Sequence, residues 1–222
     1  MALGHGCAPY TAGVVARALH LVRHGEVLNP AGVVYERLPE FRLSARGRAM
    51  AAMTAEWLAD KPVTRLIASP LLRTQQSAQP IAERFGLPVE PDERVIEAWN
   101  RFAGREVRAS VRRHPQELLL FRNPLRPTWG EPFSAVRDRM RPVVLEALRD
   151  GDPEHDVVIV SHQLPIWMVH RSVEGAALAH DPRRRRCALS SVTSFAIRDG
   201  HVVETGYADP AASVPAIDEG AA

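Results

Sequence analysis

Residues 18–26 read Ala-Leu-His-Leu-Val-Arg-His-Gly-Glu, an apolar run followed at once by charged and small residues. The run predicts a strand over residues 18–22. Behind it, His24 supplies a nitrogen nucleophile, Arg23 a fixed positive charge for phosphoryl oxygens, and Gly25 a place where backbone can approach closely. The stretch therefore indicates a phosphate-handling site at a strand end. The competing interpretation is a chance tripeptide whose histidine is only a hydrogen-bonded structural residue.

Two further apolar runs end in residues that could complete the same pocket. They are residues 66–73 (LIASPLLR) and residues 157–162 (VVIVSH). Ligands of open α/β sheets bind outside the carboxyl ends of the strands, at the point where the strand order reverses. We therefore expect the side chains that follow these three strands to converge in one pocket: Arg23, His24, Arg73 and His162.

Arg73 stands in a sequence context that favours an anion site. Ser69 is a candidate N-cap, Pro70 suits the first helical position, and Arg73 then falls in the first turn of a helix. An arginine in a first turn is electrostatically unfavourable against the helix dipole. A bound anion would offset this cost, so the placement of Arg73 also indicates phosphate.

Hydrophobic and turn patterns along the chain alternate between strands and helices. Strands are expected over residues 18–22, 65–68, 88–90 and 157–160, with a hairpin over 192–197 and 201–205 joined by Asp199-Gly200. Helices are expected over residues 44–60 with Ser44 as cap, from the Arg73 turn to about Gly86, and over 132–149 and 164–173. This alternation predicts an α/β fold: a three-layer α/β/α sandwich with a mainly parallel sheet and an antiparallel edge strand.

Two stretches are rich in arginine. Residues 101–129 interrupt the alternation and fit either a basic cap that steers an anionic substrate or a solvated helical excursion. Residues 183–186 (RRRR) could bind nucleic acid or an acidic partner. This run lacks interleaved aromatic residues, which favours a surface role. We therefore expect no nucleic-acid partner.

Composition excludes several kinds of chemistry. The chain has 222 residues, of which 45% are hydrophobic and 24% charged, and a formal net charge of +2, as is ordinary for a soluble globular protein. Lys61 is the only lysine, so a P-loop lysine is absent and Schiff-base chemistry is disfavoured. Arginine supplies almost all the positive charge, and its planar fork suits phosphate.

Cysteines and histidines give no sign of a metal site. Cys7 and Cys187 are far apart and lack a CxxC partner, and the histidines form no HExxH motif. We expect reduced thiols, no required metal and no cofactor. Residues 1–17 do not read as a signal peptide, and no stretch approaches the roughly 20 apolar residues of a membrane span. We therefore expect a cytoplasmic protein without membrane contact, with an N-terminal extension over residues 1–17.

Six short motifs, in this order along the chain, resemble those of the histidine phosphatase superfamily, in the branch of phosphoglycerate mutases and small bacterial-type phosphatases. They are RHGE at 23–26, LSARG at 43–47, SPLLRTQQSA at 69–78, VIE at 95–97, GE at 130–131 and VSH at 160–162. The resemblance covers residues 18–207 and implies a phosphoglycerate mutase-like fold. The domain is then expected over residues 18–208, with a cap insertion over 98–130 and a C-terminal tail over 209–222.

The resemblance implies a role for each matching residue. His24 is the nucleophile that forms a phosphohistidine, Glu97 is the general acid and base, and the phosphate pocket consists of Arg23, Arg73 and His162. Physical chemistry agrees with these roles, because nearby guanidinium groups favour a neutral His24. A carboxylic acid shielded from water can likewise keep its proton near neutral pH.

Departures from the mutase pattern narrow the expected reaction. Val27 stands where mutases carry Ser, Asn29 falls one residue earlier than their Asn, and residues 97–102 (EAWNRF) lack their Glu-Arg-His-Tyr-Gly. A mutase must retain a bisphosphorylated intermediate, whereas a phosphatase needs only to admit water. Hydrolysis of a small anionic phosphate ester is therefore favoured, with Asn29 lining the substrate pocket.

Several alternatives stay open at this level. Phosphoglycerate mutase-type phosphoryl transfer and a non-catalytic, phosphate-recognising, partner-binding protein are the alternative functions. Glu26 competes with Glu97 as the proton donor, although a structural hydrogen bond is the favoured interpretation for Glu26. The oligomeric state is open, and a homodimer is among the alternatives.

Overall fold

The structure is a computed structural model that describes residues 15–122 and 128–218. Its sheet contains six strands: β1 (Ala18–Arg23), β2 (Val63–Ala68), β3 (Val89–Pro91), β4 (Asp156–Ser161), β5 (Val192–Arg198) and β6 (His201–Ala208). The α-helices are α1 (Ala45–Trp57), α2 (Leu72–Phe85), α3 (Val107–Arg113), α4 (Phe133–Arg149) and α5 (Gln163–Val173). Short 3-10 helices occupy Glu93–Val95, Pro115–Arg122 and Pro182–Arg184.

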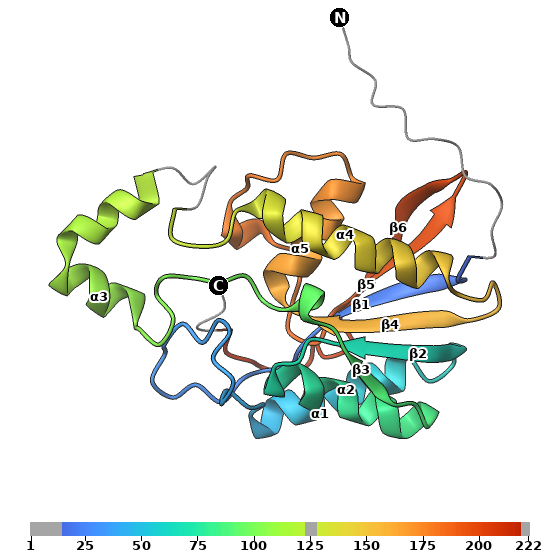
Figure 1. The fold of residues 1–222 in the computed structure, drawn as a ribbon. Helices are drawn as coiled ribbons and strands as arrows, with labels where there is room; N and C mark the ends of the chain where they lie inside the picture. Colours follow the sequence, from blue (N-terminus) through green and yellow to red (C-terminus); the bar gives the residue numbers. More distant parts are fainter. Residues whose placement is uncertain (1–14, 123–127, 219–222) are drawn as a thin grey trace, which may run out of the picture.

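The strands lie in the order β3-β2-β4-β1-β5-β6. The first four are parallel, and β5 runs antiparallel to both of its neighbours. Helices α1 and α2 cover one face of the sheet, and α4 and α5 cover the other (Figure 1). This arrangement confirms the predicted three-layer sandwich with a mainly parallel sheet and an antiparallel edge strand.

The two faces of the sheet form two apolar layers. On β4, Val157 and Ile159 pack in the cluster that contains α4 and α5 residues, whereas Val158 and Val160 pack in the cluster that contains α1 and α2 residues. All six residues of β4 are buried. Helices cover both faces of the sheet, so both sets of side chains on a central strand are buried. This explains why the central strands are continuous apolar runs instead of alternating apolar and polar residues.

The observed N-cap residue agrees with the prediction for α1 and differs from it for α2. Ser44 caps α1 as predicted, because its hydroxyl accepts a hydrogen bond from the Gly47 N–H at 2.9 Å. The prediction that Ser69 caps the next helix is wrong, since α2 begins at Leu72 and its N-cap is Leu71. The Ser69 hydroxyl instead lies 2.8 Å from His162 Nε2. Arg73 still falls in the first turn.

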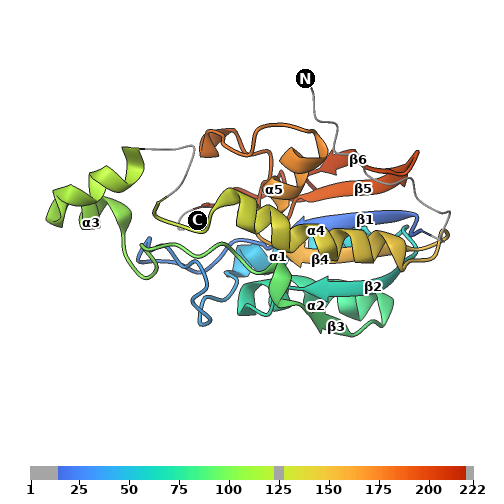
Figure 2. The same ribbon diagram turned by 45° about the horizontal axis from the view of Figure 1, so that its top comes forward.

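Residues 98–130 form an excursion from the α/β body, and the part that the structure describes contains α3 and the helix Pro115–Arg122. Its two ends meet in an isolated bridge between Asn100 and Gly130. In both ribbon views α3 lies at the outer end of the molecule, away from the sheet (Figures 1 and 2). Of the described part of the predicted cap, only the base is therefore next to the strand ends.

The chain after β6 returns to the carboxyl ends of the central strands. Ala211 and Val214 pack against Met50 and Leu189. The Ile217 N–H then donates to Glu26 Oε2 at 2.9 Å. We call residues 209–218 the C-terminal segment. Most of the predicted N-terminal extension, residues 1–14 with Cys7, lies outside the described residues. Within the described ranges no helix has the length and apolar character needed to cross a membrane.

Candidate active site

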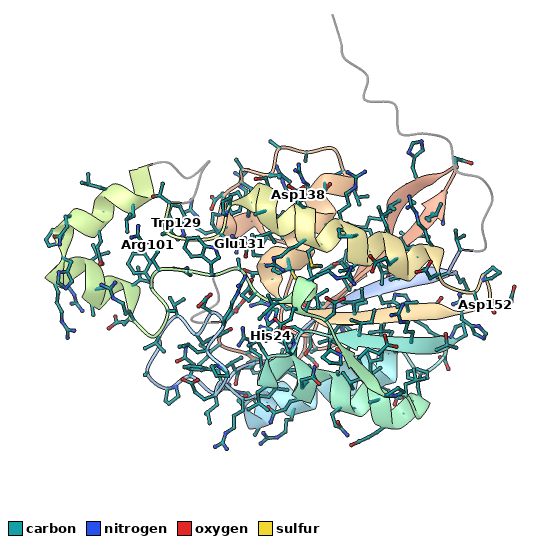
Figure 3. The ribbon with its side chains drawn as sticks, in the orientation of Figure 1. His24, Arg101, Trp129, Glu131, Asp138 and Asp152 are labelled. Atoms are coloured by element: carbon teal, nitrogen blue, oxygen red, sulfur yellow. The ribbon has the colours of Figure 1, made fainter. Side chains whose placement is uncertain are left out.

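The site lies at the carboxyl ends of β1, β2 and β4. The register aligns these ends, because Arg23 lies opposite Ser161 and Ala68 lies opposite Val160. Figure 3 shows His24 at this end of the strands and Asp152 at the opposite end. The structure therefore brings together the residues that the sequence placed after three separate strands.

His24 is buried and oriented by its own neighbour. Its Nδ1 lies 2.8 Å from the carbonyl oxygen of Gly25. A carbonyl can only accept, so Nδ1 carries the proton and Nε2 keeps its lone pair. Burial, followed by the positive charges of Arg73 and Arg23, holds the pKa of His24 well below its ordinary value. The imidazole is therefore neutral, as a nucleophile must be.

Gly25 is required by a backbone contact. A Cβ atom built on Gly25 would lie 2.4 Å from the carbonyl oxygen of Gly47, near the start of α1. A Cβ atom on Gly47 would in turn lie 2.0 Å from the carbonyl oxygen of Glu26. The close approach that the sequence assigned to Gly25 is thus to the backbone of α1. It holds the loop after β1, and with it His24, against that helix.

Arg23 and Arg73 are fully buried guanidinium groups. Arg73 donates to the carbonyl oxygen of Glu36, and its guanidinium carbon lies 4.8 Å from the centre of the Tyr35 ring. Three nitrogens, Nε of Arg23 and Nε and Nη1 of Arg73, have no acceptor among the residues that the structure describes. Buried donors without acceptors are costly, and an anion with several oxygens would satisfy them.

The other nitrogens of Arg23 have protein partners. Nη1 donates to the carbonyl oxygen of Cys187 at 2.7 Å and to Asp218 Oδ2 at 2.8 Å, and Nη2 donates to Asp218 Oδ1 at 2.5 Å. Asp218 belongs to the C-terminal segment, and this two-point contact raises the pKa of Arg23 despite its burial. A carboxylate thus occupies one edge of a guanidinium that was predicted to bind phosphate.

His162 follows β4 and is the N-cap residue of α5. Its ring centre lies 5.2 Å from that of His24, and its Nδ1 lies 3.4 Å from Arg73 Nη2. Burial and the charge of Arg73 hold the pKa of His162 well below its ordinary value. The ring is therefore neutral, and any hydrogen bond it donates to an anion is that of a neutral imidazole.

The two candidate proton donors have opposite environments. Burial raises the pKa of Glu97, which lies 3.9 Å from His162 Nδ1 and accepts from the Ala98 N–H at 2.8 Å. Burial alone would raise the pKa of Glu26 too. Hydrogen bonds from Ser44 and Ile217 and the charge of Arg46 outweigh this effect, so the pKa of Glu26 is lowered. Glu97 is thus the carboxyl group that retains a proton more readily, and Glu26 is fully engaged in structural hydrogen bonds.

Asn29 has a local role in the structure. Its side-chain amide donates to the Val33 carbonyl oxygen at 2.9 Å and accepts from the Val33 N–H at 3.2 Å. These bonds close the loop that leads to Tyr35. Contact between Asn29 and a substrate stays a prediction.

A cavity of about 290 Å³ lies next to Glu97 and Arg23, because Ala98 and Asp218 line it. Its walls include Ala98 and Trp99 next to Glu97, the pair Trp129 and Phe133, and Asp218. Figure 3 shows Trp129 and Glu131 on the side of His24 that faces the excursion. The cavity therefore lies between the residues that adjoin Glu97 and the base of residues 98–130.

Four contributors to the site were not identified from the sequence. Tyr35 lies under Arg73, and Ser69 contacts His162. Arg185, from the run assigned to the surface, lines the cavity, and burial lowers its pKa to about 10. Asp218 contacts Arg23 from 195 residues away. For Arg185, the run of arginines at residues 183–186 was the only sequence feature that pointed to a binding role. No sequence feature indicated that Asp218 would lie at the site.

One group of potential metal ligands occurs in the described ranges, outside this site. It consists of His170, Glu174 and Glu204, and Arg186 already pairs with Glu204 there. Cys187 is a free thiol in the described structure, and burial raises its pKa to about 11.

Comparisons with known proteins agree on one family. The family model described as histidine phosphatase superfamily (branch 1) matches residues 19–210. An uncharacterized protein of Mycobacterium tuberculosis is 48% identical over 196 residues, which cover 87% of this chain and 96% of that protein. Phosphoserine phosphatase 1 of Hydrogenobacter thermophilus is 31% identical over 72% of this chain and 78% of its own. The native structure of a mycobacterial glucosyl-3-phosphoglycerate phosphatase superposes with a TM-score of 0.68 and 25% identity, covering 85% of this chain and 96% of that one.

Proposed function

Because the chain belongs to the histidine phosphatase superfamily, we propose that it is a metal-independent phosphomonoesterase that acts on a small anionic phosphate ester through a phosphohistidine at His24. The observation that carries the proposal is the pairing of a neutral, buried His24 with the buried guanidinium donors of Arg23 and Arg73 that lack acceptors in the described structure. An uncharged nucleophile among unsatisfied cationic donors suits a dianionic phosphate group.

In the first step, the Nε2 lone pair of His24 attacks phosphorus and the bond from phosphorus to the ester oxygen breaks. Glu97 gives its proton to that oxygen, so the leaving group departs as an alcohol. Arg23, Arg73 and His162 hold the three phosphoryl oxygens while charge on them increases.

In the second step, Glu97 is a carboxylate and takes a proton from water. The water oxygen attacks phosphorus, the bond from phosphorus to Nε2 breaks, and its electron pair returns to His24. Inorganic phosphate leaves, and Glu97 is again a carboxylic acid. The 3.9 Å between Glu97 and His162 Nδ1 is consistent with a carboxyl group next to the phosphoryl position.

Hydrolysis of phenyl phosphate in excess EDTA, with His24→Ala run in parallel, tests this proposal. We expect turnover by the unchanged protein and a loss of at least about 10³-fold in the variant, which should still bind inorganic phosphate through the arginines. Equal turnover by both proteins would exclude His24 as the nucleophile. A requirement for metal would exclude the metal-independent mechanism, and activity that appears only after priming with a bisphosphate would indicate a mutase.

A further inference from the structure

The cavity beside Glu97 has mainly aromatic and apolar walls. Trp99 and Trp129 come from the base of the excursion, Phe133 begins α4, and Leu164 lies in α5. Trp99 is 42% exposed although it adjoins a fully buried catalytic candidate. An exposed indole that lines a concavity offers a flat apolar surface to a ligand.

The polar groups in the same walls are already engaged with protein partners. Asn100 accepts from the Phe102 N–H at 2.9 Å, and Gln163 accepts from Arg185 at 3.0 Å. Arg185 also donates to His180 at 2.9 Å. Glu131 accepts from both Arg37 and Arg139. A polyhydroxylated leaving group would compete with these bonds at the acceptor oxygens, whereas an aromatic one gains contact area without disturbing them.

We propose that this cavity binds the leaving group and selects phosphate monoesters of planar or bulky apolar alcohols over those of sugars. This inference rests on the proposed function. In-line attack by His24 directs the ester oxygen away from the nucleophile and toward Glu97, the proton donor. Ala98 and Trp99 directly follow Glu97 in the chain and line the cavity. The organic group attached to that oxygen therefore continues along these walls.

Two aryl esters of similar leaving-group acidity test the proposal, 2-naphthyl phosphate and phenyl phosphate, with glucose 6-phosphate as the sugar ester. We expect kcat/KM for the naphthyl ester to exceed that for the phenyl ester by roughly tenfold, from the apolar area of the second ring. The sugar ester should be the poorest of the three. Trp99→Ala and Trp129→Ala should each reduce the naphthyl preference, and Trp129→Phe should retain most of it.

Trp57→Ala on α1 is the matched control, because Trp57 packs against the opposite apolar layer. It should leave the naphthyl-to-phenyl ratio unchanged. Calorimetric binding of both aryl esters to His24→Ala repeats the comparison without turnover. Equal affinities would overturn the cavity assignment whether or not the protein is a phosphatase. Unequal affinities with no turnover by the unchanged protein would instead overturn the proposed function alone.

An independent observation concerns the C-terminal segment. The Asp218 carboxylate binds both Nη atoms of Arg23 in a two-point contact, a kind of contact that phosphate oxygens also make with guanidinium groups. Further contacts hold the segment in place, since Ile217 donates to Glu26 and Arg46 donates to the Pro215 carbonyl oxygen at 3.1 Å. Asp218 also lines the leaving-group cavity. The segment is therefore anchored on the loop that carries His24, through Glu26, and on the first turn of α1, through Arg46.

We infer that the C-terminal segment is a built-in competitive ligand of the site, in which Asp218 holds the Nη edge of Arg23, next to the Nε that lacks an acceptor in the described structure, until an anionic substrate displaces it. A tethered carboxylate has a high effective concentration, so it competes although it carries less charge than phosphate. Displacement needs only the last described residues to move, because Ala211 and Val214 can stay packed on Met50 and Leu189.

Binding of inorganic phosphate to Asp218→Asn tests this inference by calorimetry, with Asp138→Asn as the control of equal charge change on the exposed surface of α4. We expect Asp218→Asn to bind phosphate several-fold more tightly and to show a lower KM. The control should match the parent protein. Unchanged or weaker phosphate binding by Asp218→Asn would overturn the inference, and weaker binding would make Asp218 an aid to substrate binding instead. Because phosphate binding needs no turnover, this result is separate from that of the phosphatase assay.

Discussion

The proposed phosphoryl end and the proposed leaving-group end of the site are built in different ways. At the phosphoryl end, His24 and His162 follow β1 and β4 directly, and both are at most 1% exposed. At the leaving-group end, Trp99 and Trp129 belong to connections at the base of the excursion and are partly exposed. The first end is part of the core, and the second end is part of the surface.

This difference in burial suggests that the residues for the chemical step and the residues for substrate choice lie in different parts of the site. Strand register and close packing fix the groups that we propose to hold and attack phosphorus, so a small change there would disturb the reacting geometry. Loop residues at the other end can vary without unfolding the sheet. We therefore expect changes at the phosphoryl end to affect kcat most and changes around the cavity to affect the choice of substrate.

Among the substitutions that test this difference between the two ends, Arg73→Lys is expected to reduce activity most. The substitution keeps the positive charge but removes the planar fork and its fixed donors. We expect kcat/KM for phenyl phosphate to fall by about 10²- to 10³-fold. Arg84→Lys on the same helix is the control, because Arg84 is partly exposed and pairs with Glu56. A loss below tenfold in Arg73→Lys would show that charge alone is sufficient at this position.

Glu97→Gln is expected to have the next largest effect, about 10²-fold on kcat. Burial raises the pKa of Glu97, so activity that depends on its proton declines as pH rises through that raised value. The variant should lose this alkaline decline, and its defect should be larger for an alkyl phosphate than for phenyl phosphate, whose leaving group needs less protonation.

The pH–rate profile of Glu26→Gln, compared with that of Glu97→Gln, tests which carboxyl group is the proton donor. The pKa of Glu26 is lowered, so this carboxyl group is ionised throughout the neutral range. We expect Glu26→Gln to keep the alkaline decline of the pH–rate profile. If Glu26→Gln abolishes the decline and Glu97→Gln does not, the two roles are exchanged.

Gly25→Ala tests how tightly the phosphoryl end is packed. The new methyl group would overlap the Gly47 carbonyl oxygen, and we expect the free energy of unfolding to fall by about 3 kcal/mol. Gly206→Ala on β6 is the control, because a Cβ atom there meets nothing within 4 Å. Urea unfolding monitored by circular dichroism measures both variants. Equal stability of the two would mean that the loop after β1 relaxes freely.

The smallest effect is expected at the outer end of the excursion. Arg112 and Arg113 lie in the last turn of α3, away from the cavity walls. The double change to Gln should alter kcat/KM by less than about twofold at low salt. Arg185→Gln, within the cavity wall, should cost about tenfold. A large, salt-dependent loss in the α3 variant would instead support the basic cap that steers an anionic substrate.

Regular elements and the strand-end residues were largely predictable from the sequence. The period of the apolar residues located the central strands, Ser44 and Gly86 marked helix ends, and the rule for ligand sites in open sheets selected His24 and Arg73. No helix bounds were predicted within residues 107–122, for which a solvated helical excursion was one of two interpretations. Part of their structure depends on the side chains of Arg105, Ser110 and Glu117 bonding to one another, which no apolar period reveals.

Contacts between distant positions were decided only by the tertiary structure. The hydroxyl of Ser69 turns to His162 instead of capping α2, across 93 residues, and Asp218 reaches Arg23 across 195. The sequence by itself determined the sheet, its polar strand ends and the kind of chemistry those ends support, because these depend on local period and on a general property of parallel sheets. Which carboxyl group keeps a proton, and which one lies on Arg23, depends on burial and partners that exist only after the chain has folded.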